Sequence, residues 1–215
     1  MNFFGHAVAA CWRNDATGFV LGAMLPDFAT MCGGKIAGVD NQPMADGLDW
    51  HHVCDAAFHR MPMFRDRVMA ASGRMQSRSI RRGPARGAAH VGFELFLDGC
   101  LLGNEPAVDA YRAALDRADP GDLGERIRWR DGRAADRFEI LRRRLIRVGS
   151  PTGYADKDVV IGRVIQVLSR RPRLAPDDSE LEALAHELRI LGREVDALAA
   201  SLMDQLAHRV MTQHR

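Results

Sequence analysis

Hydrophobic residues recur every three or four positions along most of the chain, which is the spacing of one face of an α-helix. The clearest stripe consists of leucines and valines between residues 181 and 206. Two aspartates and a serine at 177–179 follow Pro176 just before this stripe, where a helix-capping residue is expected. The pattern therefore predicts a long helix over residues 178–212.

The same spacing predicts a helical fold for the rest of the chain. Further helices are predicted over residues 2–12, 17–31, 44–59, 63–75, 88–102, 105–117, 122–147 and 154–169. Pro26 should interrupt the second of these, because proline lacks a backbone N–H and disturbs a helix interior. Glycines at 32–38 predict a loop, and polar, basic residues at 77–87 predict a loop or the entry to a helix. No alternating pattern of convincing length predicts a strand, so we expect an all-α, single-domain helical bundle.

Length and composition agree with one globular domain over residues 1–215, with 47% hydrophobic residues. No apolar run reaches the roughly 18 residues of a membrane span, so no membrane contact is expected. The first charged residue is Arg13, whereas a secretory signal carries positive charge before its apolar stretch. The four cysteines form no Cys-x-x-Cys pair, which favours free thiols. We therefore expect a cytoplasmic protein.

Arginines form three clusters, at residues 78–86, 142–147 and 170–173. The net charge of +2 is too small to argue for nucleic-acid binding. Each cluster could be an ordinary solvated surface. Alternatively, the clusters could bind an acidic partner, because arginine holds carboxylates and phosphates through paired hydrogen bonds. The candidate partner-binding residues are Arg82, Arg86, Arg143 and Arg171.

Histidines and acidic residues gather in the first hundred residues at helical spacing. His51, Asp55 and His59 follow one another at intervals of four residues, so a helix over 44–59 can bring them to one side. His52 is adjacent, but the spacing to Asp55 favours His51 as the ligand.

A second set, His90, Glu94 and Asp98, repeats this spacing within the apolar segment 88–102. A carboxylate in such surroundings must be paired, hydrogen-bonded or bound to metal. Two such sets on facing helices can close a metal site inside a bundle, since each helix supplies ligands from adjacent turns. Weak surface ion pairs are the alternative interpretation.

Asp27 and His6 complete the candidate site. Asp27 follows Pro26 and precedes Phe28, so we expect it to point inward, although aspartate at such a position can also cap a helix. His6 lies in an apolar helix and alone would be read as a core histidine. The candidate metal ligands, all within residues 1–104, are His6, Asp27, His51, Asp55, Glu94 and Asp98.

These motifs resemble the acyl-carrier-protein phosphodiesterase family, in chain order. Asn2–His6 resembles the family's Asn-Phe-Leu-Ala-His, and Leu21–Phe28 is similar to its Gly-Asn-Leu-Leu-x-Asp-Phe. Gly47–Asp55 resembles Gly-Ile-x-x-His-x-x-x-Asp, and Glu94–Asp98 stands where the family has a paired Asp-x-x-x-Asp. Leu168–Leu174 resembles a Ser-Arg-Arg-Pro-Arg-Leu stretch.

The resemblance implies a fold distantly related to the HD-type metal phosphohydrolases. It implies hydrolysis of the phosphodiester that joins 4′-phosphopantetheine to a serine of acyl carrier protein, an acidic partner. Manganese is the implied metal, and mixed His and carboxylate ligands also suit zinc or iron. Asp27 matches the family's essential aspartate, and His59 or His90 could protonate the leaving alkoxide, so these three are the candidate catalytic residues.

Three positions depart from the family pattern. The family has a histidine where this chain has Gly99, an aspartate at His59 and no histidine at His90. A helical protein that binds an acidic partner without catalysis is therefore one alternative. A phosphoesterase with another substrate is a second, because the Leu-Pro-Asp step and the His-x-x-x-acid pairs also resemble the zinc-dependent phospholipase C group.

Overall fold

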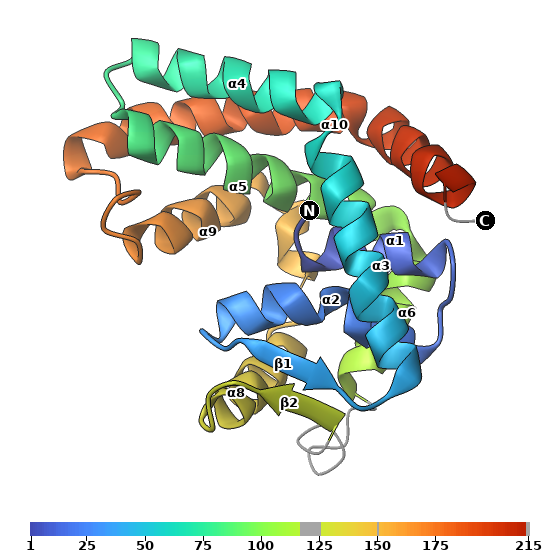
Figure 1. Cartoon of the computed structure of the whole chain (residues 1–215). Coiled ribbons are helices and arrows are strands. Elements are labelled where there is room, and N and C mark those ends of the chain that lie inside the picture. The colour runs from blue at the N-terminus through green and yellow to red at the C-terminus, as the bar shows by residue number, and fades with distance from the viewer. Residues whose placement is uncertain (117–125, 150, 214–215) are drawn as a thin grey trace. The chain divides into compact units, whose positions relative to one another are not determined.

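The computed structural model describes residues 1–116, 126–149 and 151–213, and most of these are helical, which confirms the all-α prediction. The helices are α1 Phe3–Cys11, α2 Thr17–Met31, α3 Gln42–His59, α4 Pro62–Ser77, α5 Arg82–Cys100, α6 Glu105–Asp116, α8 Ala134–Arg147, α9 Lys157–Ser169 and α10 Leu181–Gln213 (Figure 1). Short 3-10 helices are η1 Leu101–Gly103, η2 Thr152–Ala155 and η3 Asp178–Glu180. In the described part of the chain, no helix is long and apolar enough to cross a membrane.

Two predicted elements were wrong. Strand β1, Ile36–Val39, begins inside a predicted loop and pairs antiparallel with β2, Ile127–Trp129, which lies inside a predicted helix. Strands of four and three residues are too short to show an alternating pattern in the sequence. Residues 122–125 of that predicted helix lie outside the described residues. Pro26, moreover, does not interrupt α2, which continues through it to Met31.

The chain divides into two compact units, each assembled from separate stretches of sequence. Unit 1 comprises Met1–Ala57, Leu101–Pro151 and Leu206–Arg215, and unit 2 comprises Phe58–Cys100 and Thr152–Gln205. The single domain over residues 1–215 stays a prediction.

The core of unit 1 is built on aromatic rings from α1, α2 and α6, three helices that pack against one another (Figure 1). Phe3 lies with its ring centroid 5.5 Å from Phe28 and 5.9 Å from Tyr111. Phe4 meets Tyr111 edge to face at 5.7 Å. All four side chains are fully buried, and α1 therefore enters the core along almost its whole length.

Two glycines allow α2 and α3 to approach closely in unit 1. A Cβ atom at Gly22 would lie 2.1 Å from the carbonyl oxygen of Met44, and one at Gly47 would lie 2.1 Å from that of Phe19. Neither position has room for a side chain, because these contacts are to backbone atoms. The two backbones therefore touch, which brings the later turns of α2 and α3 close to each other.

In unit 2, α5 is the central helix. Figure 1 shows it between α4 and α9, and both helices pack against it. Helix α10 also packs on α5, with Leu188 facing Gly92 and Gly192 facing Phe96. Arg74 of α4 and Arg78, the residue that follows this helix, both form ion pairs with the buried carboxylate of Glu187 on α10.

Glu180, just before α10, is predicted to make the stability of the protein sensitive to acid. The Arg81 guanidinium donates hydrogen bonds to the Glu180 carboxylate, and the backbone N–H groups of Arg81 and Asp177 donate two more. These bonds outweigh the effect of burial, which raises the pKa, and together they lower the pKa of Glu180 from its ordinary 4.5 to about 2. A depressed folded-state pKa contributes stability above the unfolded pKa, and this contribution is lost as the pH falls from 4.5 toward 2.

Urea unfolding at a series of pH values measures this dependence. The free energy of unfolding should fall less between pH 4.5 and 2 in Glu180→Gln than in the wild type. Glu182→Gln, at an exposed position nearby, is the matched control and should keep the wild-type slope. Equal slopes in all three proteins would contradict the assignment.

Candidate functional site

His6, Asp27 and His51 converge in unit 1, one from each of α1, α2 and α3. They form a set, here called the first group, in which one ligand atom per residue lies within 4.8 Å of the others. His6 Nε2 is 3.9 Å from Asp27 Oδ2. Both histidines are buried, and 23% of the Asp27 side chain is exposed. Three residues predicted as metal ligands thus lie together.

His51 is held in one orientation and one tautomer. Its Nδ1 lies 2.8 Å from the carbonyl oxygen of Ala23, which can only accept, so Nδ1 carries the proton and Nε2 keeps its lone pair. Burial, with the neighbouring charge of His6, lowers the pKa of His51 to about 3. The ring is therefore neutral near pH 7, which is the form that binds metals. The adjacent His52 is exposed.

Asp55 borders the first group from the turn of α3 after His51. Its Oδ1 lies 3.5 Å from His6 Nε2 and accepts a hydrogen bond from the α-amino group of Met1 at 2.8 Å. The indole N–H of Trp50 donates to the carbonyl oxygen of Ala9 at 2.9 Å, which ties α3 to α1. This bond and the close α2–α3 approach together fix where His51 and Asp55 lie.

His59, His90 and Glu94 form a separate set in unit 2, here called the second group. His59 ends α3, and the other two lie one turn apart on α5. The Nε2 atoms of His59 and His90 are 3.2 and 3.1 Å from Glu94 Oε1, and 3.3 Å from each other. Burial opposes ionisation of Glu94, but its hydrogen bonds to the two imidazoles are among the causes that hold its pKa below the usual value.

Three phenylalanines support the second group. The Phe64 ring centroid lies 4.5 Å from that of Phe58 and 5.0 Å from that of Phe93. The same ring meets His59 edge to face at 5.1 Å and His90 at 5.3 Å. Both imidazoles are therefore packed against a buried aromatic cluster, which limits their rotation.

Asp98 lies in neither group. It is fully buried on α5, and its charge adds to the effect of burial in raising the pKa of Tyr154 in η2. Its role as a metal ligand stays a prediction. The next residue, Gly99, has no space for a side chain, because a Cβ there would lie 2.3 Å from the carbonyl oxygen of Tyr154. Packing of η2 on α5 therefore excludes the histidine that the resembling family has at this position.

Gly99→Ala is expected to destabilise the protein by about 1–3 kcal/mol, since the added methyl group overlaps a backbone oxygen. The loss would appear as a lower urea midpoint with an unchanged slope. Gly162→Ala is the matched control in unit 2, because a Cβ at this helical position meets open space. That change should stabilise slightly, as alanine favours helix over glycine. A Gly99→Ala protein as stable as the control would refute the steric argument.

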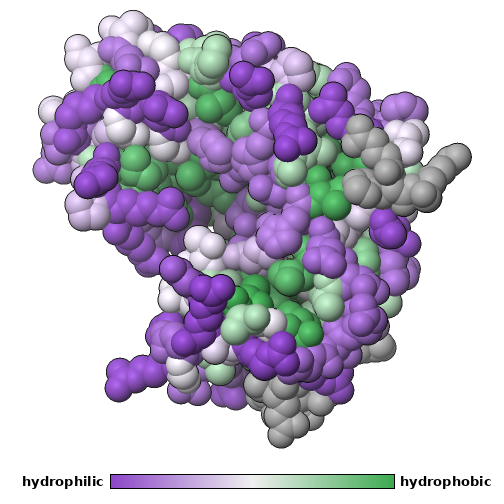
Figure 2. Space-filling model, in the orientation of Figure 1, coloured by the Kyte–Doolittle hydropathy of each residue, from purple (hydrophilic) through white to green (hydrophobic). Residues whose placement is uncertain are grey.

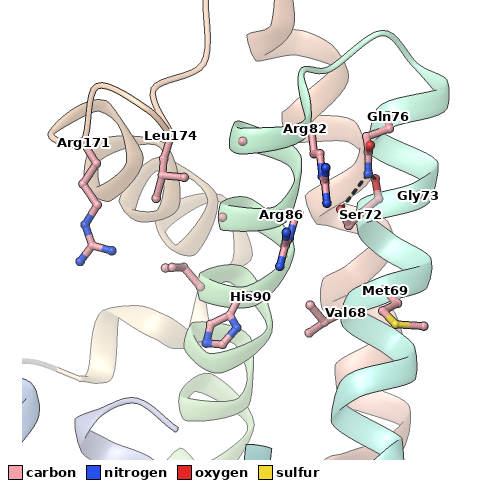
Figure 3. Close-up of a pocket in the computed structure, with 13 residues that line it drawn as sticks. Val68, Met69, Ser72, Gly73, Gln76, Arg82, Arg86, His90, Arg171 and Leu174 are labelled. Atoms are coloured by element: carbon pink, nitrogen blue, oxygen red, sulfur yellow. Dashed lines mark hydrogen bonds between the residues drawn. The ribbon is translucent and has the colours of Figure 1, made fainter.

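The predicted partner-binding arginines differ in their surroundings. Arg82, Arg86 and Arg171 line a groove of about 890 Å³ in unit 2, which also reaches His90 of the second group (Figure 3). We call it the arginine groove. Arg143, in contrast, forms an ion pair with Glu139 one turn away on α8.

Comparisons with known proteins leave the family assignment open. No family model, no curated protein and no solved structure matches the chain.

Proposed function

We propose that this protein is a divalent-metal-dependent phosphodiester hydrolase whose metal site is the first group, His6, Asp27 and His51. The observation that carries the proposal is the convergence of these residues from three helices, with ligand atoms within 4.8 Å. Burying two imidazoles beside a carboxylate is costly, and a cation between them offsets that cost. Acyl carrier protein is the substrate that the sequence resemblance implies.

The residues of the first group and their neighbour Asp55 have different roles in metal binding. Asp27 supplies a negative charge, and His51 supplies a neutral imidazole whose orientation is fixed by Ala23. Asp55, whose Oδ1 lies 3.5 Å from His6 Nε2, is placed to supply a further carboxylate ligand. A divalent ion bound here supplies a water of lowered pKa and positive charge for the phosphate oxygens. The mixed nitrogen and oxygen set suits manganese, zinc or iron.

A second function, binding of an acidic partner without catalysis, is favoured by the arginine groove. Arg82, Arg86 and Arg171 are exposed there, and guanidinium groups hold carboxylates or phosphates in pairs of hydrogen bonds. This function needs no metal and no hydrolysis.

Incubation of the protein with holo-acyl carrier protein distinguishes these functions. The protein is stripped of metal with a chelator, resupplied with manganese, zinc or iron(II), and the carrier is followed by mass spectrometry. We expect metal-dependent loss of 4′-phosphopantetheine. Cleavage of a synthetic phosphodiester without cleavage of the carrier would support the hydrolase with another substrate. Tight carrier binding without cleavage of either substrate would overturn the hydrolase in favour of the binding protein.

A further inference from the structure

The geometry points to a second metal site, of zinc type, formed by His59, His90 and Glu94 in unit 2. We propose further that the arginine groove beside it holds the phosphate or carboxylate group of a ligand that carries an apolar part. This site is distinct in its residues from the first group, and it stands whether or not the first group is catalytic.

The ligand atoms of the second group already have the spacing that a metal requires. Zinc–nitrogen bonds of about 2.0–2.1 Å at tetrahedral angles put neighbouring ligand atoms about 3.3 Å apart. The three distances among His59 Nε2, His90 Nε2 and Glu94 Oε1 are 3.1, 3.2 and 3.3 Å. A single ion can therefore meet all three atoms without movement of the helices.

The three atoms of the second group converge on one point. Each imidazole can donate an Nε2–H to Glu94 Oε1, and a divalent ion can replace both hydrogens because the same three atoms face it. A divalent ion satisfies both nitrogens and the oxygen together, and two histidines with one carboxylate are a common metal-binding set that leaves coordination positions open.

The arginine groove gives this site access and a charge preference. Arg82, Arg86 and His90 follow one another at intervals of four residues on α5, so they line one side of the groove (Figure 3). His90 thus belongs both to the second group and to the groove wall. An anion that lies along these arginines can reach the metal position.

Among the described residues, none forms an ion pair with the arginines that line the groove. Arg74, Arg78 and Arg81 nearby are paired with glutamates, as their ion pairs show. Arg82, Arg86 and Arg171 form no ion pair with any residue that the structure describes. An anionic ligand would supply the missing negative charge.

The lining of the groove is partly apolar. Met69 is 65% exposed, and Val68, Val91 and Leu174 also line the groove. Figure 2 shows hydrophobic residues among hydrophilic ones on the face where α4 and α5 lie. A hydrophobic portion of the ligand would cover this surface, since exposed apolar area on a groove wall favours contact with a ligand.

Zinc titration by calorimetry, with metal analysis after dialysis, tests the metal site. The wild type should bind about two zinc ions, one at each group. Asp27→Asn should lose one, Glu94→Gln should lose the other, and His208→Gln, at an exposed histidine, should lose neither. Glu94→Gln and His90→Gln proteins that fold, by circular dichroism, and still bind as much zinc as the wild type would overturn the site. If only Asp27→Asn loses zinc, the first group binds the metal and the proposed second site is overturned.

Binding of inorganic phosphate to the zinc-loaded protein tests the groove. Arg82→Gln and Arg86→Gln should each weaken phosphate binding by about tenfold, as expected for loss of a charge-assisted hydrogen bond. Arg65→Gln, an exposed arginine of α4 outside the groove, should leave the affinity unchanged. Unchanged affinity in both groove variants would refute the anion site.

Discussion

Replacing Asp27 with asparagine is expected to lower kcat for phosphodiester cleavage by about a thousandfold or more. Asparagine keeps the shape of the side chain but removes the charge that holds a divalent ion beside His6 and His51. A factor of that size corresponds to several kcal/mol of lost transition-state stabilisation. The measurement is the rate of 4′-phosphopantetheine release, or of synthetic diester cleavage, with manganese in excess.

The matched control is Asp49→Asn, which removes a carboxylate from an exposed position on α3. It should keep the wild-type rate, and both variants should keep the helical circular-dichroism signal. Wild-type turnover in Asp27→Asn would contradict the assignment of the first group as the catalytic site. A parallel loss in both variants would show an effect of net charge and would contradict it equally.

Gly47→Val is expected to cause the largest loss of stability of any change proposed, at least about 3 kcal/mol. A Cβ at Gly47 would lie 2.1 Å from the carbonyl oxygen of Phe19, and two further methyl groups would have to find room in the same contact. Helices α2 and α3 would have to separate, and Asp27 and His51 would separate with them. Calorimetric unfolding and metal affinity should therefore both fall.

Gly73→Ala provides the comparison, because a Cβ at this helical position meets open space. That change should raise stability slightly and leave metal affinity alone. If Gly47→Val unfolded at the wild-type temperature, the close approach of α2 and α3 could not be what positions the first group.

The sequence predicted most helices, because apolar residues recur at helical spacing along most of the chain. The last helix is the clearest example: its leucine spacing and the acidic residues before it locate Asp177–Glu180 and Leu181–Gln213 within a few residues. The strands at Ile36–Val39 and Ile127–Trp129 were missed, since they depend on pairing between segments distant in the sequence. The prediction that Pro26 interrupts the second helix is wrong, because packing within unit 1 keeps α2 helical despite the missing N–H.

The candidate site was predictable as a set of residue types but not as two groups. Helical spacing placed His51, Asp55 and His59 on one side of a helix, yet it could not show which other helices each residue meets. The structure puts His51 with His6 and Asp27, and His59 with His90 and Glu94. The close packing of α2 and α3 could have been predicted from Gly22 and Gly47, because glycines inside two predicted helices indicate close helix packing.

An anomalous-difference map from crystals of the protein grown with manganese tests directly whether the first group binds a metal ion. A peak is expected in unit 1 within bonding distance of His6, Asp27 and His51, and no such peak is expected in crystals of Asp27→Asn. Crystals that contain manganese elsewhere, but show no peak between those three side chains, would contradict it.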